Sequence, residues 1–492
     1  MTDAPASSLT FGQAIAAMAL EDPDRPAVTC GEESISRREF HESTNRLARA
    51  YAELGVTPGS MVTISLPNGI EFLQSAFAVW KLGATPQPVS YRLPGRELSA
   101  ILDLVQPSLV IGASAEDLGD HNGVQAGFTP PDAISSEDLP PAAADYWKAP
   151  TSGGSTGRPK VILANAPAVV ESVAGFVPLM GLPVGGTLLA TGPFYHNGPF
   201  MTASIGLLFG VHIVVMPRFD AAVALELIES HRVQWMYGVP TMMLRIWRLP
   251  DDLRLGRDLS SLERILHMAA PCPPWLKRAW IEWLGGDVVW ELYAGTEVQA
   301  MTLISGTEWL EHPGSVGRVF LGEMRVLDAE GKDVPAGQDG TIWMRRGADE
   351  PSPYVYVGAE AKAIEDGWEC LGDIGHIDAD GYVYLTDRDS DMILVGGSNV
   401  YPAEVEAALE EHPAVRTSCV VGVPNEDLGN IVHAVVELDG DVSDEELLAF
   451  CAERVVTYKV PRVLHRSDSP LRDDAGKVRR ASVREELIKR AT

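Results

Sequence analysis

The chain has 492 residues and a formal net charge of −29 at pH 7. This length is too great for one hydrophobic core and predicts about three folding units. The negative charge argues against nucleic acid or an anionic membrane as a partner, because both bind basic surfaces that release counterions. Any anionic ligand must therefore be held by local positive charge.

Five cysteines are scattered along the chain, and none forms a C-x-x-C pair. This pattern indicates neither a disulfide framework nor a zinc site. The first residues lack a basic segment followed by an apolar core, so we expect no signal peptide and a cytoplasmic protein.

The first 300 residues alternate between helical and strand-like patterns. Helical periodicity is found in residues 11–20, 37–54, 71–82, 221–230, 241–247 and 274–284, and apolar strand-like runs in residues 61–66, 235–238 and 262–269. Such alternation is typical of an α/β architecture with a mainly parallel sheet. We predict two α/β subdomains.

One stretch could be mistaken for a membrane span. Between Glu171 and Arg218 there is no Asp, Glu, Lys or Arg. Prolines interrupt the stretch, and its apolar part is shorter than the ~20 residues that a bilayer requires. We predict a buried helix over residues 199–209 and a buried strand over residues 211–216 instead.

The pattern changes twice in the second half of the chain. Short alternating strands such as 323–327, 340–344 and 381–385 predict a small antiparallel, β-barrel-like module. After Arg388 the pattern is α+β, with helices at 402–411 and 444–455 and strands at 417–423 and 433–438. Charged and polar residues around Asp389 and Ser390 place the domain boundary there, which gives domains of residues 1–388 and 391–492.

Basic residues are concentrated near the C-terminus of this acidic chain. They supply local positive charge or simply form a solvated helix face. The residues are Lys459, Arg462, Arg466, Arg472, Lys477, Arg479, Arg480, Arg484, Lys489 and Arg490.

A hydroxyl-rich and glycine-rich loop, T-S-G-G-S-T-G-R-P-K, spans residues 151–160. Its glycines let backbone N–H groups approach phosphate oxygens, and Lys160 supplies a countercharge. The loop is not a Walker A motif, because Arg158 and Pro159 separate Gly157 from the lysine. It is better interpreted as a phosphate-binding loop between two strands than as a plain surface loop.

Further motifs follow this loop in a fixed order. They are W-E-L-Y-A-G-T-E at residues 290–297, Gly372-Asp373, Arg388, Gly396-Gly397 and Gly476-Lys477. Together they resemble the adenylate-forming superfamily of acyl-CoA synthetases, peptide-synthetase adenylation domains and firefly-type luciferases. The resemblance covers nearly the whole chain and implies ATP, Mg²⁺, coenzyme A and a carboxylic acid as ligands.

The resemblance also implies roles for individual residues in nucleotide binding. Tyr293 would stack on adenine, Thr296 would donate to the α-phosphate, and Glu297 would hold Mg²⁺. Asp373 would accept hydrogen bonds from both ribose hydroxyls, and Arg388 would contact the ribose. The remaining implied nucleotide-binding residues are Thr151, Ser152, Gly153, Gly154, Ser155, Thr156, Gly157 and Lys160 for phosphate, and Ala269, Ala270, Pro271 and Ala294 beside the adenine.

Two catalytic steps are implied. Lys477 would supply positive charge to acyl-adenylate formation, and the C-terminal domain would then rotate about a hinge at residues 389–390. Rotation would bring Gly396, Gly397 and Ser398 to the CoA path. His196 would lie between the acyl pocket and that path, although a core histidine is also possible there.

The chain departs from the family pattern at several positions. Ala294 replaces a glycine, Ser390 replaces the usual hinge Asp or Lys, and Asp473 and Asp474 flank the Gly-Lys turn. We therefore retain three alternatives to a complete ligase. These are an enzyme that only transfers acyl groups from acyl-adenylate to CoA, a luciferase-like oxygenase, and a non-catalytic nucleotide-binding protein.

Substrate class is predicted from two features. Residues 196–198 contain no acidic side chain to bind an amino group, and residues 269–275, A-A-P-C-P-P-W, resemble bacterial ligases for bulky acids. A polycyclic steroid or terpenoid acid is the predicted substrate, in a wide pocket lined by Ala203, Gly206 and Tyr237. We expect a monomer or homodimer.

Overall fold

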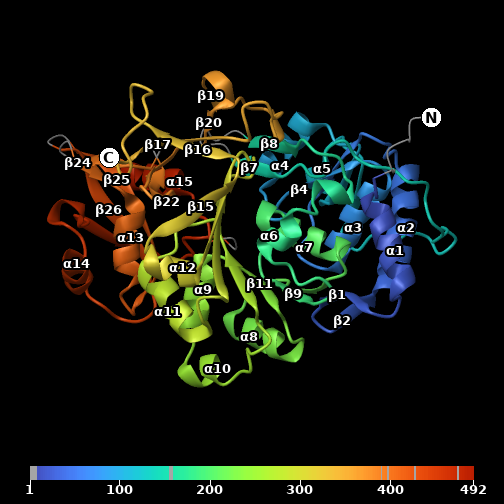
Figure 1. The fold of residues 1–492 in the computed structure, drawn as a ribbon, viewed down its shortest axis with the longest axis horizontal. Helices are drawn as coiled ribbons and strands as arrows, with labels where there is room; N and C mark the ends of the chain where they lie inside the picture. Colours follow the sequence, from blue (N-terminus) through green and yellow to red (C-terminus); the bar gives the residue numbers. More distant parts are fainter. Residues whose placement is uncertain are drawn as a thin grey trace.

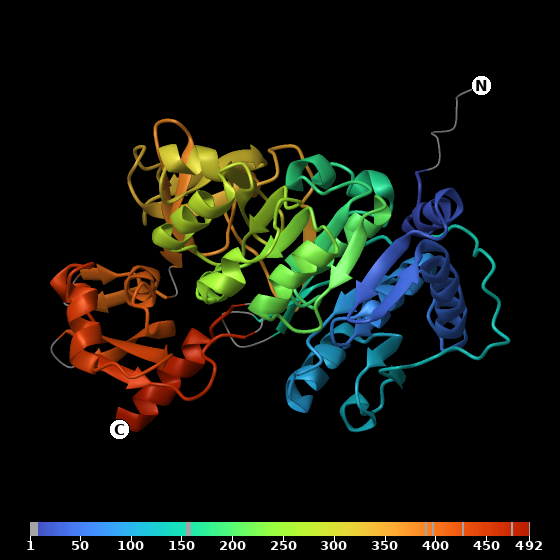
Figure 2. The same cartoon turned by 90° about the horizontal axis from the view of Figure 1, so that it is seen from below.

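The computed structural model describes residues 8–153, 159–388, 391–395, 398–425, 428–473 and 476–491. Elements up to residue 388 form the larger part of the molecule, and those after residue 391 form a smaller C-terminal lobe beside it (Figure 1, Figure 2). The predicted mixed α/β class is confirmed. The predicted hinge, Asp389 and Ser390, lies outside the described residues.

The first sheet is parallel, with the order β4-β3-β5-β6. Its strands are β3 (Met61–Ile64), β4 (Thr85–Pro88), β5 (Leu109–Gly112) and β6 (Gly123–Gln125). The helices of this region are α1 (Phe11–Glu21), α2 (Arg37–Glu53), α3 (Ile70–Lys81), α4 (Gly95–Val105) and α5 (Ala115–Leu118). Capping boxes at Thr10 and Ser36 start α1 and α2, since each side-chain oxygen accepts a backbone N–H three residues on. The three helices predicted here are confirmed to within one residue.

The second sheet combines parallel and antiparallel strands. Its parallel strands follow the order β13-β12-β11-β9-β10-β1, and β2 pairs antiparallel with β1. These strands are β1 (Pro26–Cys30), β2 (Glu33–Ser36), β9 (Thr187–Ala190), β10 (His212–Val215), β11 (Trp235–Gly238), β12 (Arg264–His267) and β13 (Val289–Ala294).

The predicted antiparallel module continues this second sheet and is not separate from it. β14 pairs with β13, and the order then runs through β15, β22, β21, β17, β20 and β19, with β16 on β17. Its strands are β14 (Met301–Ser305), β15 (Ser315–Leu321), β16 (Glu323–Leu327), β17 (Gly340–Arg345), β19 (Lys362–Ala363), β20 (Glu369–Cys370), β21 (Asp373–Ile377) and β22 (Tyr382–Arg388).

The uncharged stretch forms a core helix. α7 (Asn197–Leu208) is buried on all sides from Pro199 onward, and β10 follows it. Within the described ranges, no helix has the length and apolar character needed to cross a bilayer. The other helices around the second sheet are α6 (Phe176–Met180), α8 (Ala221–Ser230), α9 (Pro240–Trp247), α10 (Asp251–Leu255), α11 (Pro274–Leu284) and α12 (Gly306–Glu311).

A small third sheet lies next to both parts of the larger domain. Its order is β18-β8-β7, with β7 (Thr151–Gly153), β8 (Pro159–Ala164) and β18 (Tyr354–Val357). The C-terminal lobe has its own sheet, built from β23 (Ile393–Val395), β24 (Ser398–Val400), β25 (Val415–Asn425), β26 (Gly429–Leu438) and β27 (Val463–Arg466). Its helices are α13 (Pro402–Glu410), α14 (Asp444–Ala452) and α15 (Arg480–Ala491). Sequence periodicity predicted α13, α14, β25 and β26 but not α15.

Candidate active site

The glycine-rich loop joins the two strands of a hairpin, as predicted. β7 and β8 are antiparallel, with Thr151 opposite Val161. The hydroxyl of Thr151 accepts a hydrogen bond from Nε2 of Gln87 at 3.0 Å. Of the predicted phosphate-binding residues, Gly154, Ser155, Thr156 and Gly157 lie outside the described residues, and Ser152 and Gly153 are described by their backbone alone.

Glu297 is a buried carboxylate, 5% exposed, that lies beside this hairpin. Its Oε1 accepts hydrogen bonds from Nζ of Lys160 at 3.1 Å and from the hydroxyl of Tyr356 at 2.5 Å. Burial raises the pKa of Tyr356, and the Glu297 carboxylate raises it further, so this phenol stays a hydrogen-bond donor. The structure thus brings together Lys160 and Glu297, two residues predicted from separate motifs.

Tyr293 and Asp373 are also brought together. The Tyr293 hydroxyl donates to Oδ2 of Asp373 at 2.6 Å, and Asp373 lies opposite Arg388 in the β21–β22 pair. In the second sheet, β21 and β13 are separated by β22, β15 and β14. A flat sheet would hold β21 and β13 about 19 Å apart. The hydrogen bond therefore requires the antiparallel half of the sheet to curl, which agrees with its barrel-like sequence pattern.

The predicted adenine wall follows β12. Ala269 is exposed and has a φ of +76°, a conformation that costs a non-glycine residue about 1 kcal/mol and that is concentrated at functional sites. Ala270 and Pro271 follow it directly. On the other side, Ala294 ends β13 opposite Met301 and is not among the positive-φ residues, so replacing the family glycine causes no backbone strain. Thr296 is half-buried in the turn after β13.

His196 caps the N-terminus of α7, and its Nε2 is buried without a hydrogen-bond partner among the described residues. Burial lowers the pKa of His196 to about 3, and the positive charge of Lys477 adds to the effect. The imidazole is therefore neutral at physiological pH. Its unpartnered nitrogen can accept or donate a hydrogen bond to a ligand.

Lys148 is a residue near this site that no sequence motif identified. It is 2% exposed, and its Nζ donates to Oδ1 of Asn197, the first residue of α7. The carboxylate of Glu297 is close enough to influence its pKa. A lone lysine three residues before a known motif carries no sequence signal, so only the fold places it here.

The predicted wide acyl pocket needs a correction. A Cβ on Gly206 would lie 3.0 Å from Ile213 and 3.4 Å from Val211, so this glycine allows α7 to pack on β10 and leaves no room for a ligand. Ala203 is fully buried in the same core. Tyr237 instead lies against Gly198, where a Cβ would come within 2.9 Å of its ring. The Tyr237 ring therefore packs against the first turn of α7, two residues after His196.

Lys477 lies in a tight turn that reaches the larger part of the molecule. Its N–H donates to Oδ1 of Asp473 at 2.9 Å, which accounts for one of the unusual acids beside it. Gly476 has a φ of +76°, and a Cβ there would overlap Oγ1 of Thr241 in α9. The charge of Lys477 lowers the pKa of His196, so the turn that approaches Thr241 also lies within electrostatic range of the start of α7. Ser398 begins β24, while Gly396 and Gly397 lie outside the described residues.

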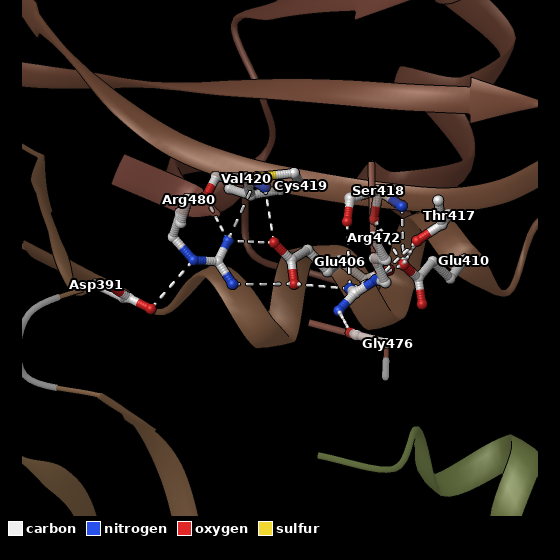
Figure 3. A network of polar contacts seen from close by, with 10 residues as sticks. All are labelled: Asp391, Glu406, Glu410, Thr417, Ser418, Cys419, Val420, Arg472, Gly476 and Arg480. Carbon is white, nitrogen blue, oxygen red and sulfur yellow. Dashed lines mark hydrogen bonds and ion pairs between the residues drawn. The ribbon is translucent and has the colours of Figure 1, made fainter. Parts of the chain in front are cut away.

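Arg472, the residue before this turn, binds two buried carboxylates of α13 (Figure 3). Arg472 donates from Nη1 to the carbonyl of Gly476 at 3.2 Å. From Nη2 it donates to Glu406 at 3.4 Å and to Glu410 at 3.3 Å. Both carboxylates are buried, so loss of the arginine would leave unpaired charge inside the lobe.

Arg480, after the turn, binds the same Glu406 (Figure 3). Its Nε also pairs with Asp391 at 3.2 Å, directly after the predicted hinge. Burial acts to lower the pKa of Arg480, but Glu406, Cys419 and Asp391 together outweigh burial and raise that pKa. The Lys477 turn, α13 and the first residue after the hinge are thereby joined in one network.

A separate contact docks α13 on the larger part. Arg248, the C-cap residue of α9, donates from Nη2 to the carbonyls of Glu410 at 2.9 Å and His412 at 3.5 Å. These carbonyls lie at the C-terminal end of α13, where the helix dipole favours positive charge. Arg479 and Glu97 add an ion pair at 3.3 Å across the same boundary.

Comparison with known families agrees with this site. Residues 15–348 match the AMP-binding enzyme family, and residues 404–476 match the AMP-binding enzyme C-terminal domain. The chain belongs to the AMP-binding enzyme family. The predicted superfamily is confirmed, and the protein is an ATP-dependent acyl-CoA ligase that uses ATP, Mg²⁺ and CoA.

Curated relatives span most of the chain. A feruloyl-CoA synthase from an Amycolatopsis species is 31% identical over 94% of this chain and 96% of its own length. A 2-succinylbenzoate–CoA ligase from Bacillus cereus strain Q1 is 28% identical over 89% of this chain and 91% of its own.

Solved structures share the fold. The o-succinylbenzoate CoA synthetase of Bacillus subtilis, in complex with its acyl-adenylate intermediate, has a TM-score of 0.83 at 23% identity, covering 97% of this chain and 98% of its own. The anthranilate CoA ligase AuaEII, in complex with anthranoyl-AMP, has a TM-score of 0.83 at 23% identity. The match covers 100% of this chain and 99% of the AuaEII chain.

The close approach of Gly476 to α9 leads to a first prediction. Gly476→Ala should slow acyl-adenylate formation by about tenfold. The added Cβ pushes the turn away from Thr241, and even a small displacement of Lys477 from the reacting groups slows a reaction strongly. The measurement is pyrophosphate release by the purified variant.

Gly440→Ala is the matched control for Gly476→Ala. It also places alanine at a positive φ in the C-terminal lobe, but a Cβ there meets nothing within 4 Å. Adding Thr241→Ala to Gly476→Ala should restore part of the lost rate. Equal effects of the two glycine variants would contradict the docking of this turn.

The anchoring of the turn leads to a second prediction. Arg472→Gln should lower the Tm, because buried Glu406 and Glu410 lose a partner, and in the folded enzyme it should lower adenylation by about tenfold while transfer from supplied acyl-adenylate to CoA stays near the wild-type rate. Arg466→Gln is the control, because Arg466 pairs with exposed Asp444 at 2.8 Å in the same lobe. A parallel fall of both half-reactions in Arg472→Gln would instead indicate a purely structural role.

Proposed function

We propose that this ligase activates a ring-bearing carboxylic acid and transfers it to CoA in two steps, with Lys477 acting in the first step alone. The close approach of the Lys477 turn to Thr241 carries this proposal, and the effect of the Lys477 charge on the pKa of His196 supports it. This position of the turn supports an arrangement of the two parts in which Lys477 faces the site of adenylation.

ATP would bind across the ends of the strands that carry the motif residues. Tyr293 and the segment 269–271 would enclose the adenine, and Asp373 with Arg388 would hold the ribose. The Tyr293–Asp373 hydrogen bond supports a shared adenosine site, because the two side chains already lie together. The hairpin residues 151–157, with Lys160, would hold the β- and γ-phosphates.

Magnesium fits the acidic side of this site. Mg²⁺ prefers hard oxygen ligands and in nucleotide enzymes uses one or two carboxylates together with phosphate oxygens. Glu297 offers a carboxylate that Lys160 and Tyr356 already orient toward the hairpin. When bound, the ion would neutralise the phosphate charge and assist pyrophosphate departure.

In the first step, a carboxylate oxygen of the acid would attack the α-phosphorus of ATP. The bond from that phosphorus to the bridging oxygen breaks, and pyrophosphate leaves. Two anionic groups meet in this transition state, so a fixed positive charge aimed at it lowers the barrier. Lys477 would supply that charge, and Thr296 would donate to the α-phosphate.

In the second step, the thiol sulfur of CoA would attack the acyl carbon of the acyl-adenylate. The bond from that carbon to the phosphate oxygen breaks, AMP leaves, and the thiol proton passes to solvent. We propose that the C-terminal lobe rotates about residues 389–390 between the steps, removing Lys477 and presenting Gly396, Gly397 and Ser398. The Arg480–Asp391 pair supports motion of the lobe as one body, because it ties the residue after the hinge to the network under Lys477.

The acid is proposed to carry a ring system. The Tyr237 ring packs against Gly198, two residues after His196, and an aromatic side chain at this position favours flat apolar groups. Polycyclic terpenoid or steroid acids are the bulkiest candidates of this class, and ferulate, named for a relative, is a smaller one. A cytoplasmic location and a monomeric or homodimeric state stay predictions.

The role of Lys477 is tested by its removal. Lys477→Ala should reduce acyl-adenylate formation by about 100-fold or more, the scale expected when positive charge is lost from such a transition state. Transfer from supplied acyl-adenylate to CoA should survive. Lys489→Ala, at an exposed position in α15 of the same lobe, should leave both rates unchanged. Equal loss of both steps in Lys477→Ala would refute the assigned role.

The substrate class is tested with a panel of acids, measured separately for pyrophosphate release and for thioester formation. A terpenoid acid, a steroid acid, ferulate and 2-succinylbenzoate should be activated in preference to palmitate. Preference for palmitate would contradict the ring proposal. Thioester formed exclusively from supplied acyl-adenylate would identify a half-reaction enzyme, and oxygen uptake after adenylation would identify a luciferase-like oxygenase.

A further inference from the structure

Three lysines are buried among the residues that the structure describes. Lys81, Lys148 and Lys277 are 5%, 2% and 0% exposed. An ammonium group has three N–H donors and a full positive charge. Its burial is costly unless the protein supplies acceptors for the donors and a partner for the charge. The three lysines differ in how well this is done.

Lys81 and Lys277 have strong partners. Nζ of Lys81 donates to Oδ1 of Asn45 at 2.6 Å, to Oγ1 of Thr44 at 2.7 Å and to the carbonyl of His41 at 3.0 Å. Nζ of Lys277 pairs with the carboxylate of Glu291 at 2.5 Å. Both lysines are thus accounted for as parts of the folded core.

Lys148 is not compensated in this way. Its Nζ donates to Oδ1 of Asn197, and within the described ranges it has no second hydrogen-bond acceptor and no ion pair. The Trp147 ring, whose centroid is 4.9 Å from Nζ, adds only a weak cation–π attraction. Burial lowers the pKa of Lys148 to about 7, against the opposing effect of the Glu297 carboxylate, and it lowers the pKa of Lys81 to about 7 as well. The two lysines therefore differ in their hydrogen bonds and not in their pKa.

The position of this amine is informative. Its partner Asn197 directly follows His196, whose buried Nε2 is also unpartnered among the described residues. On the other side, the carboxylate of Glu297, which Lys160 binds, acts on the pKa of Lys148. The amine with one acceptor and the unpartnered imidazole are linked through the adjacent residues Asn197 and His196 at the start of α7, and both can hydrogen-bond to an anionic ligand group.

We propose that Lys148, oriented by Asn197, is a fixed cation of the active site that binds an anionic oxygen of the acid and then of its adenylate. This inference rests on the proposed ligase function. Lys148 belongs to the larger part of the molecule, so its charge stays in place during both steps. Lys477, in contrast, leaves with the C-terminal lobe.

Lys148→Met tests the proposal, with Lys81→Met as a matched control. Lys148→Met should slow both adenylation and transfer from supplied acyl-adenylate by about tenfold or more, because each step loses a preorganised charge. Lys148→Gln keeps a polar group for Asn197 without the charge and should show the same loss. Lys81→Met should lower the Tm but leave the rates of the folded enzyme unchanged.

The sign of the change in Tm distinguishes Lys148→Met from Lys81→Met, because substitution removes several hydrogen bonds at Lys81 and one at Lys148. A Lys148 pKa below its ordinary 10.5 means that the unfolded chain binds more protons between about pH 7 and pH 10, so this residue disfavours folding most at the lower pH. The charged groups facing it are Glu297 and, beyond that carboxylate, Lys160. The Tm of Lys148→Met relative to wild type should therefore be more favourable at pH 7 than at pH 9.5.

The outcomes are separable. Wild-type rates in both Lys148 variants would overturn the proposal, and so would a loss of rate that follows a loss of folded protein at pH 7. Wild-type enzyme assayed in parallel on the same acid shows that the ligase activity itself is present.

Discussion

Acyl activation brings anionic groups together, and this chain carries a net charge of −29, so its positive charge must be placed residue by residue. Three lysines at the site are held in different ways. Lys160 is ion-paired to Glu297, Lys148 is buried against Asn197, and Lys477 lies on a braced turn of the smaller lobe. The first two lysines belong to the larger part of the molecule and the third to the C-terminal lobe, so in the proposed mechanism the first two charges stay while the third leaves.

Much of the fold could be predicted from local patterns. Periodicity located α1, α2 and α3 closely, because amphipathic helices with polar caps have a strong local signal. The motif residues of the site were also identifiable. Lys148 was not, since its role depends on a partner 49 residues away, and neither was the Tyr293–Asp373 contact, which depends on how the second sheet curls.

Two kinds of residue were ambiguous in the sequence for physical reasons. A helical glycine permits either ligand binding or close packing, and at Gly206 the packing against β10 is what the structure contains. The C-terminal basic residues were compatible with a solvated helix face, yet Arg472 and Arg480 are largely enclosed with Glu406. Charge patterns along a chain do not reveal which charges are paired across it.

The contact between Arg248 and α13 differs from the others in its chemistry. On the side of the lobe its hydrogen bonds use main-chain carbonyls, so these bonds do not depend on the side chains at 410 and 412, although the carboxylate of Glu410 adds an attractive charge. A substitution at position 410 therefore leaves the two hydrogen bonds of Arg248 available, and its cost falls on the buried network of Arg472 instead. The same residue thus contributes to docking through its backbone and to the interior of the lobe through its side chain.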